Sequence, residues 1–343
     1  VAILGSPKSA SGRLNLSQGF NSFGTTIAPI IGGYLVFHFF AGHGTPLLNK
    51  AGEEILTDSG LTMSAAGVQI PYIIFGLIFL MLAVIFAFAK LPSMQSNESI
   101  EKGAGALKYS QLSLGAIAIF FYVGSEVSVG STIINYLKEI LEYTEMEAKN
   151  YLAFYWGGAM IGRFIGYVSL GTSLKKGSKY VYMVLISLAG FLVIYGSTYL
   201  ESGISLSVVA PFLILIAINL LGFVIGKSMP ARTLTVFSFF IIGLLLLTLF
   251  SGGIASLWAV VGIGLFNSIM WSNIFTLAID GLGKNTSQGS SILVMAILGG
   301  ALLPLLMGVV ADAAGIKISY LILIIPYLYL AYYGWRGYIP SKS

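Results

Sequence analysis

The sequence predicts an all-α polytopic membrane protein with about ten transmembrane helices. Of its 343 residues, 57% are hydrophobic and only 9% are charged, whereas about 25% are charged in an ordinary soluble protein. The mean hydropathy of +0.90 agrees with this. Apolar runs of about 20 residues, the length that crosses the hydrocarbon core, recur along the chain. They lack the alternation of a membrane β-barrel, and in lipid a helix satisfies its own backbone polar groups over such a run.

Short polar breaks separate the apolar runs, and the least distinct break is the SGG turn at 251–253. The predicted spans are 15–40, 70–90, 110–137, 151–172, 180–200, 205–226, 233–250, 253–279, 289–311 and 317–338.

Lysine and arginine residues predict the orientation of these spans, because cytoplasmic loops carry an excess of both. With the 41–69 loop placed outside, only Lys50, Lys138, Lys149 and Lys317 of the 18 Lys and Arg residues lie outside. This asymmetry explains the formal net charge of +5 as membrane orientation, so we expect no nucleic-acid partner. The sequence therefore predicts a multi-pass protein of the inner (plasma) membrane, surrounded by the lipid bilayer.

The loop LPSMQSNESIEKGAGALKYS, residues 91–110, is the longest predicted cytoplasmic connection. Its charged, glycine and serine residues are typical of a linker between two helix bundles. Two predicted spans precede this loop and eight follow it, and the opening VAILGSPKSASGR is typical of the end of a helix followed by a loop. We therefore expect that helices at the N-terminal end are missing from this chain.

Residue types suited to catalysis or metal binding are scarce. The chain has no cysteine and two histidines, which excludes disulfides, thiolate metal sites and a histidine cluster. No HExxH or GxSxG motif is present. We therefore predict no enzymatic activity, no cofactor and no metal site.

Glu126 lies in the middle of the apolar span FFYVGSEVSVGSTIINYL. An acidic residue at mid-helix costs about 2.5–3.5 kcal/mol on insertion scales, and normally faces a bundle interior or a wet cavity. Helical spacing puts Tyr122 on the same face. Because burial favours the protonated form of a carboxyl group, Glu126 is a candidate for binding and releasing a proton. The alternative is a structural carboxylate that is hydrogen-bonded to a neighbouring helix.

Two further groups are candidates for binding a polyol. Gln18 and Asn21 lie on one stripe of the first span, and their amides offer both donors and acceptors to hydroxyl groups. Asn267 and Trp271 are one helical turn apart, so an amide stands beside a ring that can cover the apolar face of a sugar. Interhelical hydrogen bonds for the amides and a core aromatic contact for Trp271 are the alternatives.

The segment YWGGAMIGRFIG places Gly158, Gly162 and Gly166 at four-residue steps. This doubled small-xxx-small pattern favours tight packing of the fourth span against another helix. Arg163 is expected near the inside end of that span, where it can reach the interface or pair with another loop. We assign these four residues a structural or gating role.

The sequence resembles the fucose:proton symporter family of the major facilitator superfamily, and is most similar to its glucose/galactose branch. The resemblance is carried by RLNLSQGFNSFGTTIAPIIGGYL, FFYVGSEVSVGSTIINYL, YWGGAMIGRFIG, GLFNSIM and IFTLAIDGLGKNTSQGSSILVMAILGGALLPLLMGVVADAAG. It implies a major facilitator fold without its first helices, in which the first full span is the fifth of the family's twelve.

The resemblance also implies a division of the chain. Residues 1–92 correspond to the remnant of an N-terminal bundle, 93–109 to a cytoplasmic linker, and 110–338 to a C-terminal bundle. A hairpin at about 177–226 has no counterpart in the twelve-helix pattern and suggests fourteen helices in the full-length protein. In the family, Gln18 and Asn21 match an amide pair in the sugar site.

At two places the chain departs from the pattern of the fucose carriers or of the family. Glu126 matches a position that is Gln in the fucose carriers and Glu in the glucose/galactose branch, which favours a hexose over fucose. The segment WSNIF stands where the family has Pro-Thr before Ile-Phe.

The resemblance implies a secondary active transporter, a monomer that takes up glucose, galactose or fucose by proton symport and alternating access. Glu126 is the candidate for proton coupling, and Gln18, Asn21, Tyr122, Glu126, Asn267 and Trp271 are the candidates for sugar binding. The alternatives are sodium coupling and a non-transporting membrane sugar sensor.

Overall fold

The computed structural model describes residues 1–2, 5–35, 45–49, 52–56, 60, 62, 64–89, 105–172 and 174–340. Within these residues the chain is almost entirely helical, and its β structure is limited to isolated antiparallel bridges such as Leu48–Glu54. Internal contacts divide the chain into two units, one of Val1–Phe23 with Glu98–Ser343 and one of Gly24–Asn97. The predicted division at 93–109 lies mostly outside the described residues and stays a prediction.

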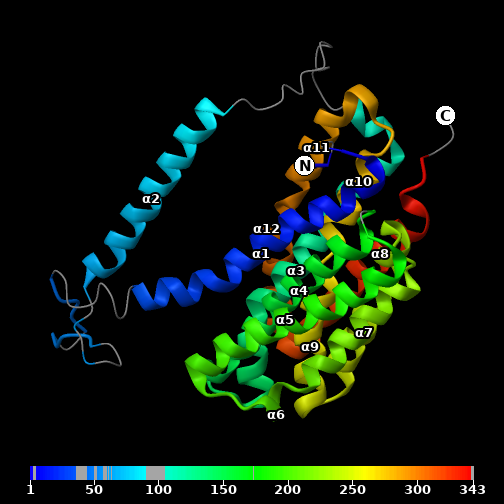
Figure 1. The fold of residues 1–343 in the computed structure, drawn as a ribbon. Helices are drawn as coiled ribbons and strands as arrows, with labels where there is room; N and C mark the ends of the chain where they lie inside the picture. The colour runs from blue at the N-terminus through cyan, green and yellow to red at the C-terminus, as the bar shows by residue number, and fades with distance from the viewer. Residues whose placement is uncertain are drawn as a thin grey trace. The chain divides into compact units, whose positions relative to one another are not determined.

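Helices account for every predicted span across the described residues (Figure 1). They are α1 (Ala10–Tyr34), α2 (Ala65–Phe88), α3 (Ser110–Leu141), α4 (Glu145–Leu170), α5 (Lys176–Ser202), α6 (Leu206–Val209), α7 (Pro211–Ile225), α8 (Pro230–Phe250), α9 (Gly253–Asn267), α10 (Met270–Ile279), α11 (Thr286–Met295), α12 (Gly299–Ala314), α13 (Ile316–Ser319) and α14 (Ile324–Tyr332).

Eight helical segments in the described part of the chain are long and apolar enough to cross a membrane. The predicted all-α membrane fold is therefore confirmed. The other two predicted spans, α1 and α4, are the least hydrophobic of the long helices because both carry polar residues. Several spans are not continuous helices, and the second-last one changes to a tighter turn at Ala296–Leu298 between α11 and α12.

The turn between α3 and α4 sets these two helices side by side. Helix α3 ends at Leu141, and the residue that follows it, Glu142, has a left-handed φ of 59°. Helix α4 begins shortly afterwards with a capping box. The Glu147 carboxylate accepts a 2.9 Å hydrogen bond from the backbone N–H of Thr144. In return, the backbone N–H of Glu147 donates a 3.3 Å hydrogen bond to the Thr144 hydroxyl. The hydrogen bonds from Thr144 hold the pKa of the exposed Glu147 carboxyl below its usual value.

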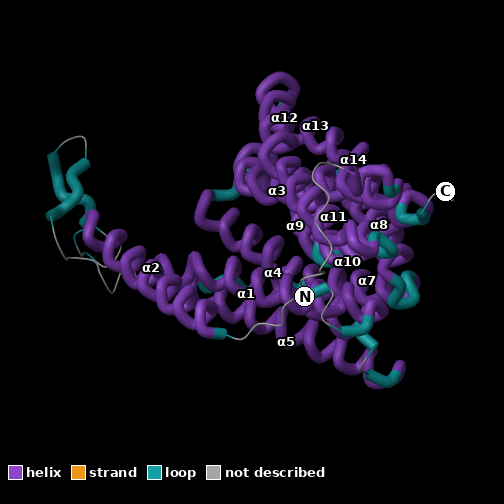
Figure 2. The backbone as a smooth tube through the Cα atoms, turned by 90° about the horizontal axis from the view of Figure 1, so that it is seen from above, coloured by secondary structure: helices purple, strands orange, loops and turns teal. Residues whose placement is uncertain are grey.

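Helix α9 forms the centre of the first unit. It packs on α3, α4, α7 and α8, and the span that it forms with α10 is the most buried of the eight. Seen from above, the helices of this unit cluster around it (Figure 2). Phe266 and Trp258 are buried there among other aromatic rings. A polar side chain that points toward α9 from a neighbouring helix is therefore not exposed to lipid.

Candidate functional site

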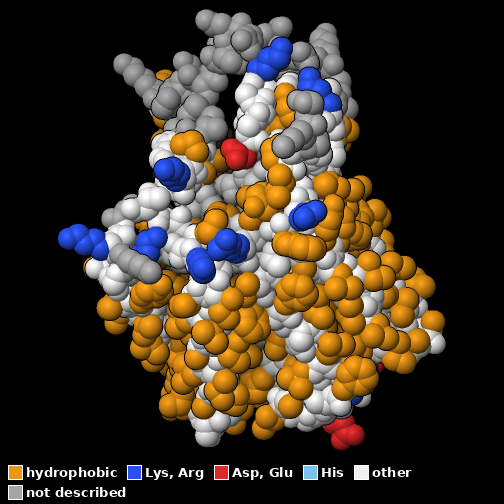
Figure 3. Space-filling model, turned by 90° about the vertical axis from the view of Figure 1, so that its right-hand side faces the viewer, with side chains coloured by type: hydrophobic (Ala, Val, Ile, Leu, Met, Phe, Trp, Pro, Cys, Tyr) orange, Lys and Arg blue, Asp and Glu red, His pale blue; other side chains and the backbone are white. Residues whose placement is uncertain are grey.

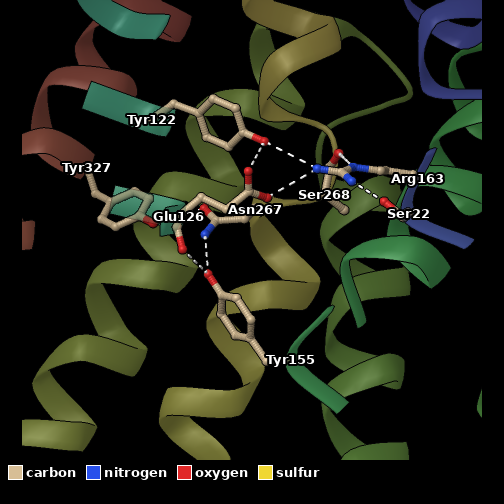
Figure 4. A network of polar contacts seen from close by, with 8 residues as sticks. All are labelled: Ser22, Tyr122, Glu126, Tyr155, Arg163, Asn267, Ser268 and Tyr327. Carbon is tan, nitrogen blue, oxygen red and sulfur yellow. Dashed lines mark hydrogen bonds and ion pairs between the residues drawn. The ribbon is translucent and has the colours of Figure 1, made fainter. Parts of the chain in front are cut away.

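An ion pair lies inside the first unit, between α3 and α4. The Arg163 Nη2 atom lies 3.2 Å from Glu126 Oε1, and the two residues are 7% and 8% exposed. One turn before Glu126 on α3, the Tyr122 hydroxyl donates a 2.8 Å hydrogen bond to Glu126 Oε2. Both carboxylate oxygens are thus engaged (Figure 4). The positive charge of Arg163 balances the negative charge of Glu126, which would be costly to bury alone in an apolar span.

The Arg163 guanidinium also joins two other helices. Its Nη1 donates to the Ser22 hydroxyl of α1, and its Nε donates to the backbone carbonyl of Ser268 at 3.2 Å. That carbonyl lies where α9 ends at Asn267 and before α10 begins at Met270. A carbonyl at the end of a helix has no partner within the helix, so the break supplies an acceptor for the arginine.

A second arm of the network runs from the backbone of Glu126. Tyr155 on α4 donates a 2.8 Å hydrogen bond to the Glu126 carbonyl. The amide of Asn267 lies between two phenol groups: its Nδ2 is 3.5 Å from the Tyr155 hydroxyl, and its Oδ1 accepts a 2.9 Å bond from Tyr327. Asn267 is fully buried. Eight residues therefore form one buried network that includes residues of α1, α3, α4, α9 and α14 (Figure 4).

The glycines of α4 allow this close arrangement. A methyl group added at Gly158 would lie 3.3 Å from the Leu265 nitrogen, and one at Gly162 would lie 2.8 Å from the Leu265 oxygen. One at Gly166 would lie 2.7 Å from Ile269 Cγ2. All three glycines thus face the α9–α10 span, which is the packing that their spacing predicts. Because the backbones approach so closely, the guanidinium of α4 reaches the end of α9.

Other predicted residues lie apart from the network. On α1, Gln18 is half-buried and Asn21 is exposed, while the neighbouring Ser22 is buried. Trp271 is half-buried and stacks on Phe275, with ring centroids 5.9 Å apart. The break between α9 and α10 separates Trp271 from Asn267, so the two residues do not share one continuous helix. The sequence reasoning treated this span as unbroken.

Arg163 differs from its sequence-based placement. It was expected near the inside end of its span, reaching the interface or pairing with a loop, but it is buried and pairs with Glu126. The sequence alone could have predicted this pair. An arginine in an apolar span is as costly as a glutamate, so opposite charges in two adjacent spans are expected to pair. Sequence reasoning also missed four members of the network, namely Ser22, Tyr155, Ser268 and Tyr327.

A second set of contacts ties α1 to α4 and α10 at the predicted cytoplasmic end. The Ser11 hydroxyl donates to Asn273 Oδ1, and Asn273 Nδ2 donates to the Pro230 carbonyl at 3.1 Å. A methyl group at Gly12 would lie 2.9 Å from the Gly171 nitrogen, so the two backbones touch. In the part of the chain that the structure describes, no group of three or more acidic, histidine or cysteine residues forms a metal site.

Curated relatives match all or nearly all of the chain. It is 37% identical over 348 residues to a glucose/galactose transporter of Brucella abortus, covering 100% of this chain and 66% of that protein. It is 30% identical over 350 residues to a putative glucose/galactose transporter of Helicobacter pylori, covering 100% and 70%. An L-fucose-proton symporter of Escherichia coli is 30% identical over 326 residues, covering 92% and 61%. The chain thus spans about two thirds of these relatives' length.

Solved structures agree with these relatives. The E. coli fucose:proton symporter FucP superposes with a TM-score of 0.69 at 26% identity, covering 100% of this chain and 72% of that one. A structure of FucP in the outward conformation, titled a major facilitator superfamily transporter, gives a TM-score of 0.68 at 26% identity, covering 100% and 71%. No protein-family model matches the chain.

Proposed function

Because this chain belongs to the major facilitator superfamily, in the family of the glucose/galactose transporters and L-fucose-proton symporters, we propose that it transports a hexose together with a proton. The substrate class is glucose or galactose, since the relatives that carry this name include the one at 37% identity. Transport proceeds by alternating access around a central site, the general mode of such two-bundle carriers.

The observation that carries the proposal is the buried Glu126–Arg163 pair. An ionisable residue within a transmembrane segment is a functional candidate, because removing its charge from water costs free energy that a purely structural residue would not require. Here the carboxylate is the negative partner of a cation that also bonds the Ser22 hydroxyl and the Ser268 carbonyl. The charge on Glu126 therefore bears on how α1, α3, α4 and the α9–α10 break are held together.

Protonation of Glu126 supplies the coupling step. A neutral carboxyl attracts the guanidinium far less than a carboxylate does. Arg163 then keeps its bonds to Ser22 and Ser268 and its longer, 3.5 Å contact with the Tyr122 oxygen. The Tyr122 hydroxyl, which the carboxylate otherwise accepts from, becomes available to a substrate hydroxyl. A sugar that binds this loosened form better than the paired form binds together with the proton, by reciprocal linkage.

The sugar contacts come from the amides and rings predicted above. Gln18 and Asn21 present amides on the less buried side of α1, and Trp271 offers a ring that is only half-buried. Asn267 is already held by two phenols, so its orientation is set before a ligand arrives. Pre-set polar groups lower the ordering cost of binding.

Alternating access requires the bundles to separate at each end in turn. In this proposal residues 1–92 belong to the N-terminal bundle, 93–109 link the bundles, and 110–338 form the C-terminal bundle with its additional hairpin at 177–226. The Ser11–Asn273 and Gly12–Gly171 contacts then close the cytoplasmic end. The carrier is a monomer in the inner membrane.

The test uses the full-length protein in proteoliposomes. Uptake of labelled glucose, galactose and fucose is followed under an imposed pH gradient and then under a sodium gradient. We expect the pH gradient to drive accumulation of glucose or galactose. In Glu126→Gln we expect accumulation to be lost while exchange of labelled for unlabelled sugar continues, because glutamine can hydrogen-bond but cannot release a proton.

The matched control is Glu139→Gln, an exposed carboxylate on the same helix α3, which should leave accumulation intact. Accumulation under the sodium gradient alone would replace proton coupling with sodium coupling. Binding of sugar without any exchange across the membrane would point to a sensor and end the transport proposal.

A further inference from the structure

A basic groove opens at the predicted cytoplasmic end of α5, away from the Glu126 network. It encloses a cavity of about 600 Å³, and its lining residues are Leu174, Lys179, Tyr180, Met183, Val224, Lys227 and Ser228. Two of these residues are lysines and none is acidic. On the face drawn in Figure 3, basic side chains likewise gather toward one end of the apolar surface. The groove thus presents unopposed positive charge beside a hydrophobic wall.

The start of α5 adds further donors at the same place. Lys175 is the N-cap residue of this 27-residue helix, and its side chain makes no capping hydrogen bond. Such a helix start attracts anions through its first N–H groups and the helix dipole. Gly177, in the first turn, has open space around its Cα. Lys175 itself is exposed and follows directly after the lining residue Leu174.

The loop on the other side of the groove holds Lys227 in a costly conformation. Lys227 and Ser228 both have a φ of 53°, in the left-handed region that normally favours glycine. Their backbone N–H groups are bonded within the loop, to Val224 and Phe223 carbonyls at 3.0 and 3.3 Å. The Ser228 hydroxyl is 2.9 Å from that of Ser169. In this loop conformation Lys227 lies in the lining of the groove.

The surface beyond the groove is apolar. Tyr180, Val184, Leu188 and Leu192 follow one another at four-residue steps along α5 and are between 40% and 63% exposed. Leu221 and Val224 of α7 are similarly exposed. Tyrosine is typical of the membrane–water interface, so Tyr180 marks the level at which the lysines meet the headgroups. The lysines of the groove can therefore contact a phospholipid headgroup, while the exposed apolar side chains of α5 and α7 contact its acyl chains.

We propose that this groove binds an anionic phospholipid of the cytoplasmic leaflet. Its phosphate is held by Lys227, by Lys179 and by the start of α5, where the exposed Lys175 adds its charge. Its acyl chains lie along the exposed apolar row of α5 that begins at Tyr180. Lys179 already donates to the Ser169 and Gly171 carbonyls at 2.9 and 2.5 Å, which fixes its position and leaves one proton for the phosphate. Basic pockets between transmembrane helices on this side of the membrane suit such headgroups. The proposal does not depend on which sugar is carried.

The test measures lipid binding to the detergent-solubilised full-length protein by native mass spectrometry. Phosphatidylglycerol is compared with phosphatidylcholine of the same acyl chains, and with inorganic phosphate. We expect phosphatidylglycerol to bind the natural protein in preference to phosphatidylcholine. In Lys175→Gln/Lys227→Gln its affinity should fall about thirtyfold, since each lysine near such a surface accounts for about fivefold.

Two further variants separate binding from folding. Lys227→Gly removes the ammonium group while meeting the left-handed backbone, so it should fold well and still lose affinity about fivefold. Lys138→Gln/Lys149→Gln removes two charges at the opposite end and should bind as the natural protein does. Equal binding of both lipids, or unchanged affinity in the groove variants, would overturn the proposal. Binding of inorganic phosphate that displaces phosphatidylglycerol would assign the groove to a soluble anion instead.

Discussion

Glu126→Gln provides the sharpest test of the buried ion pair, because it removes a charge and changes little else. The substitution leaves the Arg163 guanidinium buried with Ser22, Ser268 and the new amide oxygen as neutral acceptors. Removing one partner of a buried pair costs about 3–5 kcal/mol, and the remaining acceptors put this case at about 3 kcal/mol. Arg163→Met should cost less, since a lone carboxyl can take up a proton whereas a guanidinium keeps its charge.

The double variant Glu126→Gln/Arg163→Met separates pairing from shape. With both charges gone, it should be more stable than Glu126→Gln, because replacing a buried pair with neutral groups is often close to neutral. Unfolding of the full-length protein in mixed micelles, followed by circular dichroism, gives the three free-energy changes. The expected coupling is about 2–3 kcal/mol. Additivity of the two single variants within about 0.5 kcal/mol would show that the pair does not hold the helices together.

Three other substitutions test neighbouring features by the same unfolding assay. Gly162→Ala should destabilise the protein by about 1–3 kcal/mol through overpacking against α9, while Gly196→Ala, with open space around it, should not; equal effects would refute the close packing. Tyr327→Phe should cost about 1–3 kcal/mol by leaving a buried amide oxygen without its donor, and an unchanged stability would remove that bond from the network. Thr144→Ala should be less stable than the natural protein above the usual carboxyl pKa of about 4.3. Because the capped Glu147 has a lowered pKa, this difference should shrink as the pH falls through that lowered value, and a difference independent of pH would contradict the cap.

Residue patterns predicted the helices well because lipid leaves the backbone few choices. Apolar length alone located the spans, and Gly158, Gly162 and Gly166, which follow at steps of four, all lie close to the α9–α10 span. The cost of a mid-span charge drew attention to Glu126, which is indeed buried in a network. These inferences rest on one helix at a time, where period and burial are directly coupled.

Contacts between helices were harder to predict. The pairing of Arg163 with Glu126 depends on how far α4 is shifted along α3, which no single helix encodes. The break after Asn267 contains neither proline nor a polar run, so composition did not mark it. Tyr155 and Tyr327 have ordinary positions in apolar spans, and only the assembled bundle places Asn267 between them.

The two attachments of α1 act at different distances from the middle of the bundle. Ser22 bonds the arginine of the network and Ser11 bonds Asn273 near the end; eleven residues of helix separate them, about 16 Å along the axis. If α1 pivots at Ser22, a rotation of about 20° displaces Ser11 by about 6 Å, well beyond hydrogen-bonding range. In that motion the bond at Ser22 stays in place, whereas the bond between Ser11 and Asn273 has to break before this end of α1 can move away.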